Sequence, residues 1–305
     1  MNKFIVTTSI NNITKAIEKF DQMSDWKLIV AGDLNTPKNY KLKNGIYLSP
    51  EYQEKMSKKL SNLIGWNCIQ RRNFALLYAY NNGANIVATI DDDNIPYENW
   101  GKNLLLGKFL NVNYYQEQQC CFDPISVTNH SELWHRGYPL DMVNIKNKKK
   151  NKIKKKIFFD IQADFWDGDP DIDAVCRMIY KPECNFSANK FPFASNKISP
   201  FNSQNTFLTR KALKDYFMFP HIGRMDDIWA SYYLQTLGLK VVYSKPSVYQ
   251  DRNEHNLIND MKREYLGYEL NSNLLKNKSN FKKNLFKLLP SKSSEAFRVY
   301  KNLLK

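Results

Sequence analysis

Three consecutive aspartates, Asp91, Asp92 and Asp93, directly follow the apolar run Ile86–Ile90. A short β-branched run of this kind predicts a buried strand, so the carboxylates stand at its carboxyl end. Crowded carboxylates raise one another's pKa, and a bound divalent cation removes that cost. Mg²⁺ and Mn²⁺ prefer oxygen ligands and often share them with substrate phosphates. The run therefore predicts a metal site at a strand end, with a charged turn as the alternative.

The composition favours a globular protein whose cysteines are reduced. The chain has 305 residues, of which 43% are hydrophobic and 14% aromatic, enough to bury a sizeable core. Its five cysteines form no CxxC pair, which favours free thiols over a disulfide framework. The start, Met1–Thr8, turns polar at once, and no apolar run reaches membrane-spanning length, so we expect a cytoplasmic protein without a signal peptide.

The net charge of +15 is concentrated in two places, a lysine-rich stretch at 144–156 and the tail beyond Leu274. We expect the first to be an exposed loop and the second a basic helical face. Clustered lysines attract nucleic acid, anionic lipid or polyanionic substrates, but they are equally often simply solvated. The tail suggests peripheral association with the inner face of an anionic membrane.

The first hundred residues alternate β-rich runs with helical patterns. This rhythm predicts a parallel sheet with right-handed crossovers, within an α/β fold. We predict one catalytic domain over 1–270, with a nucleotide-binding half at 1–100, an acceptor-side half at 101–270 and a basic helical tail at 271–305. The expected strands are Phe4–Ser9, Lys27–Ala31, Ile86–Ile90, Thr206–Leu208 and Lys240–Ser244, and the main helices are Ile13–Gln22, Pro50–Leu63, Arg71–Asn81 and Asp226–Thr236.

Further polar clusters are candidates for chemistry. Asp226 and Asp227 head a predicted helix, where the helix dipole favours one carboxylate and a general base would explain the second. Arg71 and Arg72 at another helix start indicate a local anion. The acidic stretch 166–173 lacks the spacing of a calcium loop, so a surface loop is expected there. His255 lies in a polar stretch and could reach a metal or diphosphate.

In this order the segments resemble nucleotide-sugar glycosyltransferases of the GT-A fold, and most closely those of the STELLO type. The likeness runs from Phe4 to Tyr268, and the lysine-rich stretch 144–156 looks like an insertion in it. The plant members have an N-terminal membrane anchor that we do not expect here, so a Golgi role is not carried over. The similar segments are Val6–Ile10, Trp26–Asp33, Arg72–Asn73, Asp91–Asn94, Trp166–Ala174 and Asn202–Thr206.

The resemblance implies a Rossmann-type mixed sheet flanked by helices, and a Mn²⁺- or Mg²⁺-dependent inverting transfer to a glycan or lipid-linked hydroxyl, with a UDP-sugar as favoured donor. It assigns the metal to Asp93 and His255, and the catalytic base to Asp227 with Asp226 as competitor. The donor-binding residues it implies are Thr7, Thr8 and Asp33 around the nucleotide, Arg72 at the diphosphate, and Asp91 and Asp92 at the ribose or a metal-bound water.

Two other functions remain open from the sequence. Reversibly glycosylated proteins of related appearance are sugar-nucleotide mutases, which need no acceptor. A basic metal-dependent nuclease or nucleic-acid-binding protein would also use carboxylates and positive charge. The lysines, however, cluster away from the acidic motifs and no nucleic-acid module is recognisable.

Overall fold

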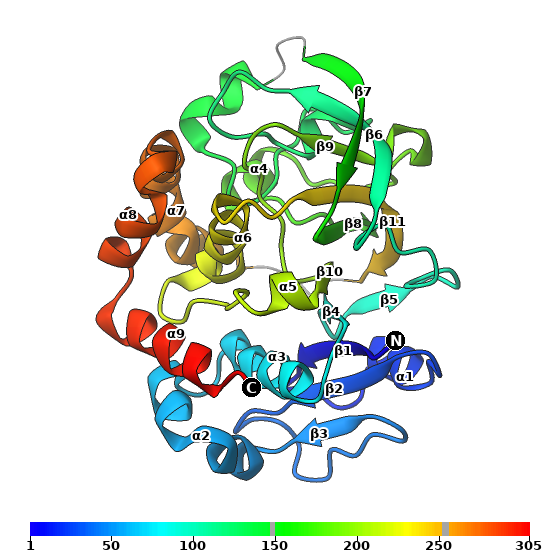
Figure 1. Cartoon of the computed structure of the whole chain (residues 1–305), viewed down its shortest axis with the longest axis vertical. Helices are drawn as coiled ribbons and strands as arrows, with labels where there is room; N and C mark the ends of the chain where they lie inside the picture. The colour runs from blue at the N-terminus through cyan, green and yellow to red at the C-terminus, as the bar shows by residue number, and fades with distance from the viewer. Residues whose placement is uncertain (147–149, 252–255) are drawn as a thin grey trace.

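Four parallel strands form one half of a mixed 11-stranded sheet, in the order β3 (Ile46–Leu48), β2 (Lys27–Ala31), β1 (Lys3–Thr8) and β4 (Ile86–Ile90). The computed structural model describes residues 1–146, 150–251 and 256–305 (Figure 1). The crossovers contain α1 (Lys15–Asp21), α2 (Pro50–Ile64) and α3 (Arg72–Asn81). Because every residue of β4 is buried, its run of apolar side chains does not alternate with polar ones. The predicted parallel α/β half is confirmed.

The other half of the sheet begins with an antiparallel strand. β10 (Asn205–Thr209) pairs with β4 so that Asn205 lies opposite Ile90. The residues just before β10 therefore lie beside the aspartates that follow β4. Beyond β10 the order is β8 (Ile161–Gly168), β11 (Val241–Gln250), β9 (Phe193–Ser195), β6 (Phe109–Gln116) and β7 (Asn151–Phe158), and β5 (Asn94–Pro96) pairs with β11.

The lysine-rich stretch is not the exposed loop that the sequence predicted. Residues 147–149 lie outside the described part of the chain, but Asn151–Phe158 forms the edge strand β7, paired with β6 along its whole length. Ile157 of β7 packs with Leu110 and Tyr114 of β6 against a small apolar cluster containing Phe159 and Val242. This inward face makes the segment a strand despite its lysines.

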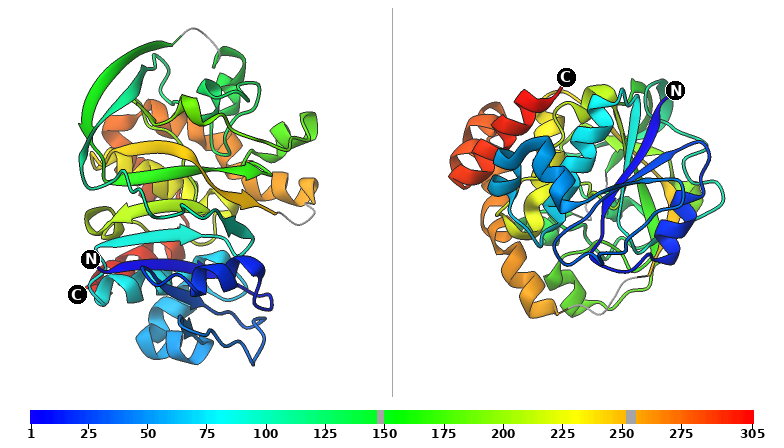
Figure 2. Two further views of the ribbon diagram at one scale, coloured as in Figure 1. Left: turned by 90° about the vertical axis from the view of Figure 1, so that its right-hand side faces the viewer. Right: turned by 90° about the horizontal axis from the view of Figure 1, so that it is seen from below.

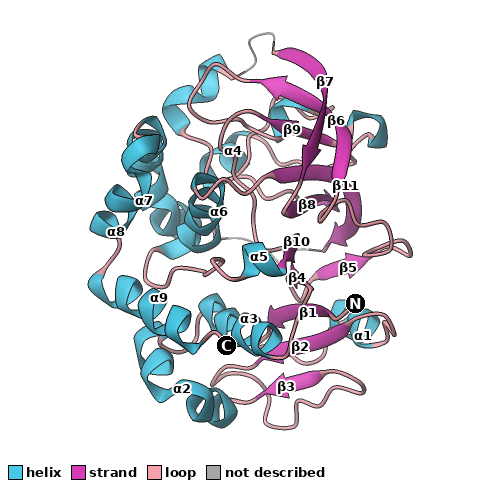
Figure 3. Ribbon diagram, in the orientation of Figure 1, coloured by secondary structure: helices cyan, strands magenta, loops and turns pink. Residues whose placement is uncertain are grey.

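The C-terminal helices pack on the body of the protein. α6 (Asp226–Thr236) is contacted by α8 (Phe281–Leu288), and α2 by α9 (Ser291–Leu303). Figure 2 (left) shows α8 and α9 behind the sheet, and Figure 3 shows α7, α8 and α9 together along one side of the molecule. The predicted mixed α/β class with a helical tail is confirmed, although the expected boundary at 270/271 falls inside α7 (Leu257–Lys276). The short helices are α4 (Ala174–Ile179) and α5 (Arg210–Leu213).

No helix in the described ranges is both long and apolar enough to cross a membrane.

Candidate active site

A cavity, here called the strand-end cavity, opens at the carboxyl ends of β1 and β2. Thr8, Asp33 and Asp92 contribute to its wall, and Thr8 Oγ1 donates a hydrogen bond to the Ala31 carbonyl over 2.6 Å. Thr7 is fully buried and does not line this cavity. The remaining lining residues are Ser9, Ile10, Asn11, Asn35, Asn67, Cys68 and Ile69.

Asp33 shapes this cavity through the backbone. Its carboxylate accepts hydrogen bonds from the N–H groups of Leu34 at 2.7 Å, Asn67 at 2.7 Å and Cys68 at 2.9 Å. The side chain is 2% exposed. Asp33 therefore fixes the turn at 67–68 against the end of β2, and Asn67 adopts a positive φ of 56° there.

The three aspartates after β4 have different surroundings. Asp91 accepts an ion-paired hydrogen bond of 2.6 Å from Arg72, and Asp92 accepts bonds from Ser9 Oγ at 2.5 Å and Asn11 Nδ2 at 3.0 Å. Asp92 lines the strand-end cavity, whereas Asp91 and Asp93 line a second cavity. The run thus stands between two adjoining hollows, which also share Ile69.

This second hollow, here called the acidic cavity, combines acids and arginines from distant segments. Asp226 and Asp227 at the start of α6 line it together with Asp91 and Asp93. The antiparallel pairing of β10 with β4 adds Ser203, as the register of the two strands requires. The other lining residues are Ile69, Arg136, Asp171, Gln204, Gly223, Arg224 and Arg263.

Asp227 is engaged through both carboxylate oxygens. Arg136 donates to them over 2.9 and 3.1 Å, and the Ser203 N–H donates over 2.9 Å. Burial alone would raise the pKa of Asp227, but the adjacent Arg136 guanidinium lowers it below the ordinary value. Asp227 is therefore a fixed, ionised partner of Arg136.

Asp226 has the opposite character. Burial, reinforced by the neighbouring Asp227, raises its pKa to about 7. Gln70 Nε2 donates to one carboxylate oxygen over 2.7 Å, and hydrogen bonding from Gln70 and the Asp227 backbone offsets only part of the rise in pKa. Such a carboxylate can accept a proton near neutral pH, which is the property that a general base requires.

The acidic stretch 166–173 is mostly buried, with Asp167 and Asp169 half-buried, and is not the surface loop that we predicted. Asp171 is fully buried and is bonded by the Arg136 guanidinium, with 2.9 Å between Asp171 Oδ1 and Nε. Asp173 accepts from Cys176 N–H over 2.8 Å and so caps α4. Asp169 pairs with Arg177. Sequence reasoning noticed this acidic stretch but missed Arg136, which has no motif around it.

The two adjacent arginines find protein partners. Arg72 donates to Ser203 Oγ over 2.8 Å as well as to Asp91. The anion beside Arg72 is therefore a carboxylate of the protein itself. The Arg71 guanidinium stacks on the Trp66 ring at 3.6 Å. Arg72 therefore contacts the aspartate run through Asp91, whereas Arg71 stacks elsewhere, on Trp66.

Metal ligation is not evident from protein groups alone. Within the described ranges, no group of three or more His, Cys, Asp or Glu side chains is arranged to hold an ion. His255 lies outside the described residues, so its assignment stays a prediction.

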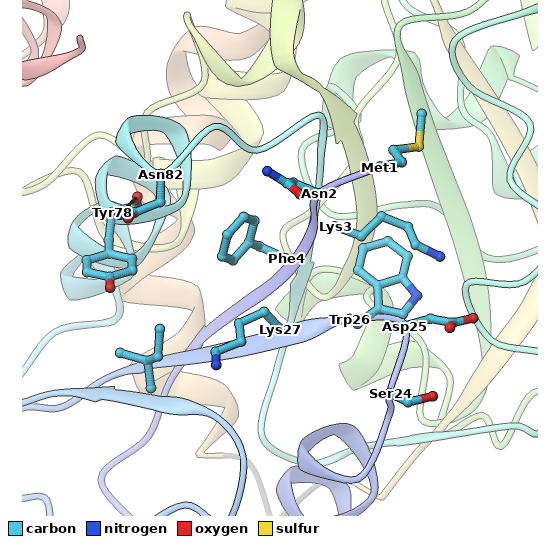
Figure 4. A pocket seen from close by; sticks show the side chains of 11 residues that line it. Met1, Asn2, Lys3, Phe4, Ser24, Asp25, Trp26, Lys27, Tyr78 and Asn82 are labelled. Carbon is cyan, nitrogen blue, oxygen red and sulfur yellow. Dashed lines mark hydrogen bonds between the residues drawn. The ribbon is translucent and has the colours of Figure 1, made fainter.

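A separate hollow of the molecule lies at the opposite edge, near the amino ends of β1 and β2 (Figure 4). Its lining includes Lys3, Trp26 and Lys27 but none of the predicted site residues. Open α/β sheets bind ligands at the carboxyl ends of their strands, so the strand-end and acidic cavities are the better candidates.

Fold and site together define an α/β protein in which strand-end carboxylates separate two adjoining cavities. The chain is similar to two probable glycosyltransferases of Arabidopsis thaliana. It is 22% identical to STELLO2 over 273 residues, which cover 81% of this chain and 35% of that protein. It is 23% identical to STELLO1 over 256 residues, covering 77% and 33%. These matches confirm the predicted resemblance to STELLO-type glycosyltransferases, and the chain spans about a third of the length of these relatives.

No protein-family model matches the chain. Among solved structures, a glucosyl-3-phosphoglycerate synthase from Mycobacterium tuberculosis aligns with a TM-score of 0.46 and 11% identity, over 89% of this chain and 80% of that one. That likeness is too distant to define the fold.

Proposed function

We propose that this chain is a metal-assisted glycosyltransferase that moves a sugar from a nucleoside diphosphate to a hydroxyl acceptor. The observation behind this proposal is the position of Asp91–Asp93 between the strand-end cavity and the acidic cavity. A donor with its nucleoside in the first cavity would extend its diphosphate past these aspartates toward Asp226. The names of the curated relatives support the same class of reaction.

The strand-end cavity is the proposed binding site of the nucleoside. Its wall offers amide and hydroxyl groups from Asn35, Asn67 and Thr8 together with the apolar side chains of Ile10 and Ile69. Ligand sites generally combine apolar walls with a few polar groups in this way. Asp33 contributes by holding the 67–68 turn, and a UDP-sugar is the donor we favour from the resemblance.

We assign a Mg²⁺ or Mn²⁺ ion to Asp93, which lines the acidic cavity and, with Asp92 and Asp251, a neighbouring hollow. Mg²⁺ is commonly held by one or two carboxylates plus substrate phosphates, so a protein cluster of three ligands is not required. The ion would neutralise the charge of the leaving diphosphate.

We further propose Asp226, the competitor in the sequence analysis, as the base instead of Asp227. Asp227 is held ionised by Arg136 and Ser203, so it cannot turn to an acceptor without breaking a buried ion pair. Asp226 lines the same cavity, has a raised pKa and accepts a hydrogen bond from the neutral Gln70 side chain. Direct attack assisted by Asp226 would invert the anomeric centre, and NMR of the product tests that stereochemistry.

The pH profile should reveal this base. Because the pKa of Asp226 is raised to about 7, its carboxylate is protonated and inactive at lower pH. We expect kcat/KM to fall about tenfold for each pH unit below this value and to level off above it. A rate that stays constant down to pH ~4, near the ordinary pKa of an aspartate, would exclude Asp226 as the base.

The donor and the metal can be tested together. Calorimetry with a panel of nucleotide sugars, each with and without Mn²⁺ or Mg²⁺, should show donor binding that needs the ion. Asp93→Ala should lose this metal-dependent gain in affinity, whereas Asp25→Ala, an exposed site at the opposite edge, should retain it. Equal metal dependence in the two variants would contradict the assignment of Asp93, and no binding by any nucleotide sugar would contradict the proposed function.

A further inference from the structure

The outer face of the β6–β7 ribbon combines exposed positive charge with exposed aromatic rings. Side chains alternate along β7, so Lys152, Lys154, Lys156 and Phe158 share one face. Phe109 of β6 lies directly opposite Phe158, and their rings meet edge to face at 5.4 Å. We define these five residues as the ribbon patch.

The other face of the ribbon packs inward beside Ile157, although Ile153 and Lys155 on that face are exposed. Leu110, Val112 and Ile157 belong to the small apolar cluster with Phe159. Figure 2 (left) shows β7 as an arc along the outer margin of the molecule. Each of the three lysines is exposed, Phe109 is 63% exposed and Phe158 is 37% exposed.

The charge of the ribbon patch is not neutralised by acids. None of Lys152, Lys154 and Lys156 forms an ion pair with another residue in the part of the chain that the structure describes, whereas Lys150 just before the strand pairs with Glu117 at 3.2 Å. Their cross-strand partners on β6 are Tyr115, Asn113 and Asn111, which are uncharged. Lysines also protect an edge strand from pairing with other chains, but that role does not need two exposed phenylalanines beside them.

We propose that the ribbon patch docks this protein on an anionic lipid bilayer, the lysines contacting headgroup phosphates and the Phe109–Phe158 pair entering the interface. Basic residues beside a membrane are attracted by its negative surface potential, and aromatic rings prefer its interfacial layer. The rings lie together at one end of the lysine row. Single-stranded nucleic acid would instead be expected to need aromatic platforms interleaved along the strand for successive bases.

This surface differs from the one that the sequence suggested. The C-terminal tail is basic, but α8 and α9 bury Phe281, Leu285, Phe297 and Tyr300 in the core, and the large apolar side chain that they expose is Leu288, not an aromatic ring. The tail therefore provides a control of similar charge. Membrane docking by the ribbon patch does not depend on the proposed transferase activity.

The test compares two triple variants of the full chain in co-sedimentation with vesicles of neutral lipid, or of neutral lipid with a third of phosphatidylserine. Wild type should bind only the anionic vesicles and be released by high salt. Lys152→Gln/Lys154→Gln/Lys156→Gln should lower the affinity about 100-fold, because each lysine near such a surface contributes about fivefold. Lys282→Gln/Lys283→Gln/Lys287→Gln removes the same charge from the tail and should lower it less than tenfold.

A second measurement separates insertion from charge alone. Phe109→Ser keeps all three lysines and should weaken binding to anionic vesicles about tenfold, since burial of an aromatic side chain contributes at that level. Circular dichroism should confirm that each variant is folded. Equal losses from the ribbon and tail variants, no effect of Phe109→Ser, or tighter binding to single-stranded DNA than to vesicles would each overturn the proposal.

Discussion

Replacing Asp226 by Asn is expected to reduce kcat by about 10²–10⁴-fold while leaving the affinity for the nucleotide-sugar donor within a factor of about three of wild type. The amide keeps the size of the side chain and can still accept the hydrogen bond from Gln70, but it cannot take a proton from the acceptor hydroxyl. Steady-state transfer rates and calorimetric donor binding, measured on the same preparation, check the two parts of this expectation.

The control is Asp215→Asn, which makes the same chemical change at an aspartate that pairs with Lys301 away from both cavities. It should transfer sugar at the wild-type rate. Asp227→Asn then distinguishes the two candidate bases. If Asp226→Asn were active and a folded Asp227→Asn were inactive with unchanged donor binding, the original assignment of Asp227 would be correct.

Removal of the Arg136 side chain should have the largest effect on stability. Arg136 is 6% exposed on its side chain and pairs with Asp171 and Asp227, which are 0% and 4% exposed. Arg136→Met would leave the buried Asp227 without its cation and Asp171 without its nearer one, with Arg224 3.9 Å away, and breaking a buried pair in this way costs about 3–5 kcal/mol of unfolding free energy. Urea denaturation at neutral pH measures the loss.

Lys59→Met is the matched control for this substitution. It removes a cation of similar length from the exposed pair with Glu295, and surface pairs of this kind contribute at most about 1 kcal/mol. Similar midpoints of unfolding for the two variants would show that the Arg136 network does not stabilise the fold. Loss of activity without loss of stability would instead assign Arg136 to substrate binding.

The nucleotide-binding half could be predicted because its signals are local. The apolar run Ile86–Ile90 and the helix entered through Ser49 and Pro50 occur where the sequence indicated, since strand burial and helix capping depend on neighbours in the chain. The same local signals predict that the aspartates after β4 lie at a ligand-binding edge of the sheet. The sequence does not predict that they divide between two cavities, because that depends on how distant segments pack.

The features that could not be predicted from the sequence depend on residues that are far apart in the chain. The 151–158 stretch forms a strand because β6 pairs with it, although its five exposed polar and charged residues resemble those of a loop. The choice between Asp226 and Asp227 depends on Arg136, 91 residues away from Asp227 in the chain. A lone arginine outside any motif gives no sign of which carboxylate it will neutralise.

Arg72 and Ser203 connect Asp91 with Asp227 along the wall of the acidic cavity. Arg72 donates to Asp91 and to Ser203, and Ser203 in turn donates to Asp227. A phosphate that drew Arg72 away from Asp91 would loosen Ser203 and change the field around Asp227 and its neighbour. Donor and acceptor would then influence each other's affinity reciprocally, so that the order in which they arrive becomes a property of the protein.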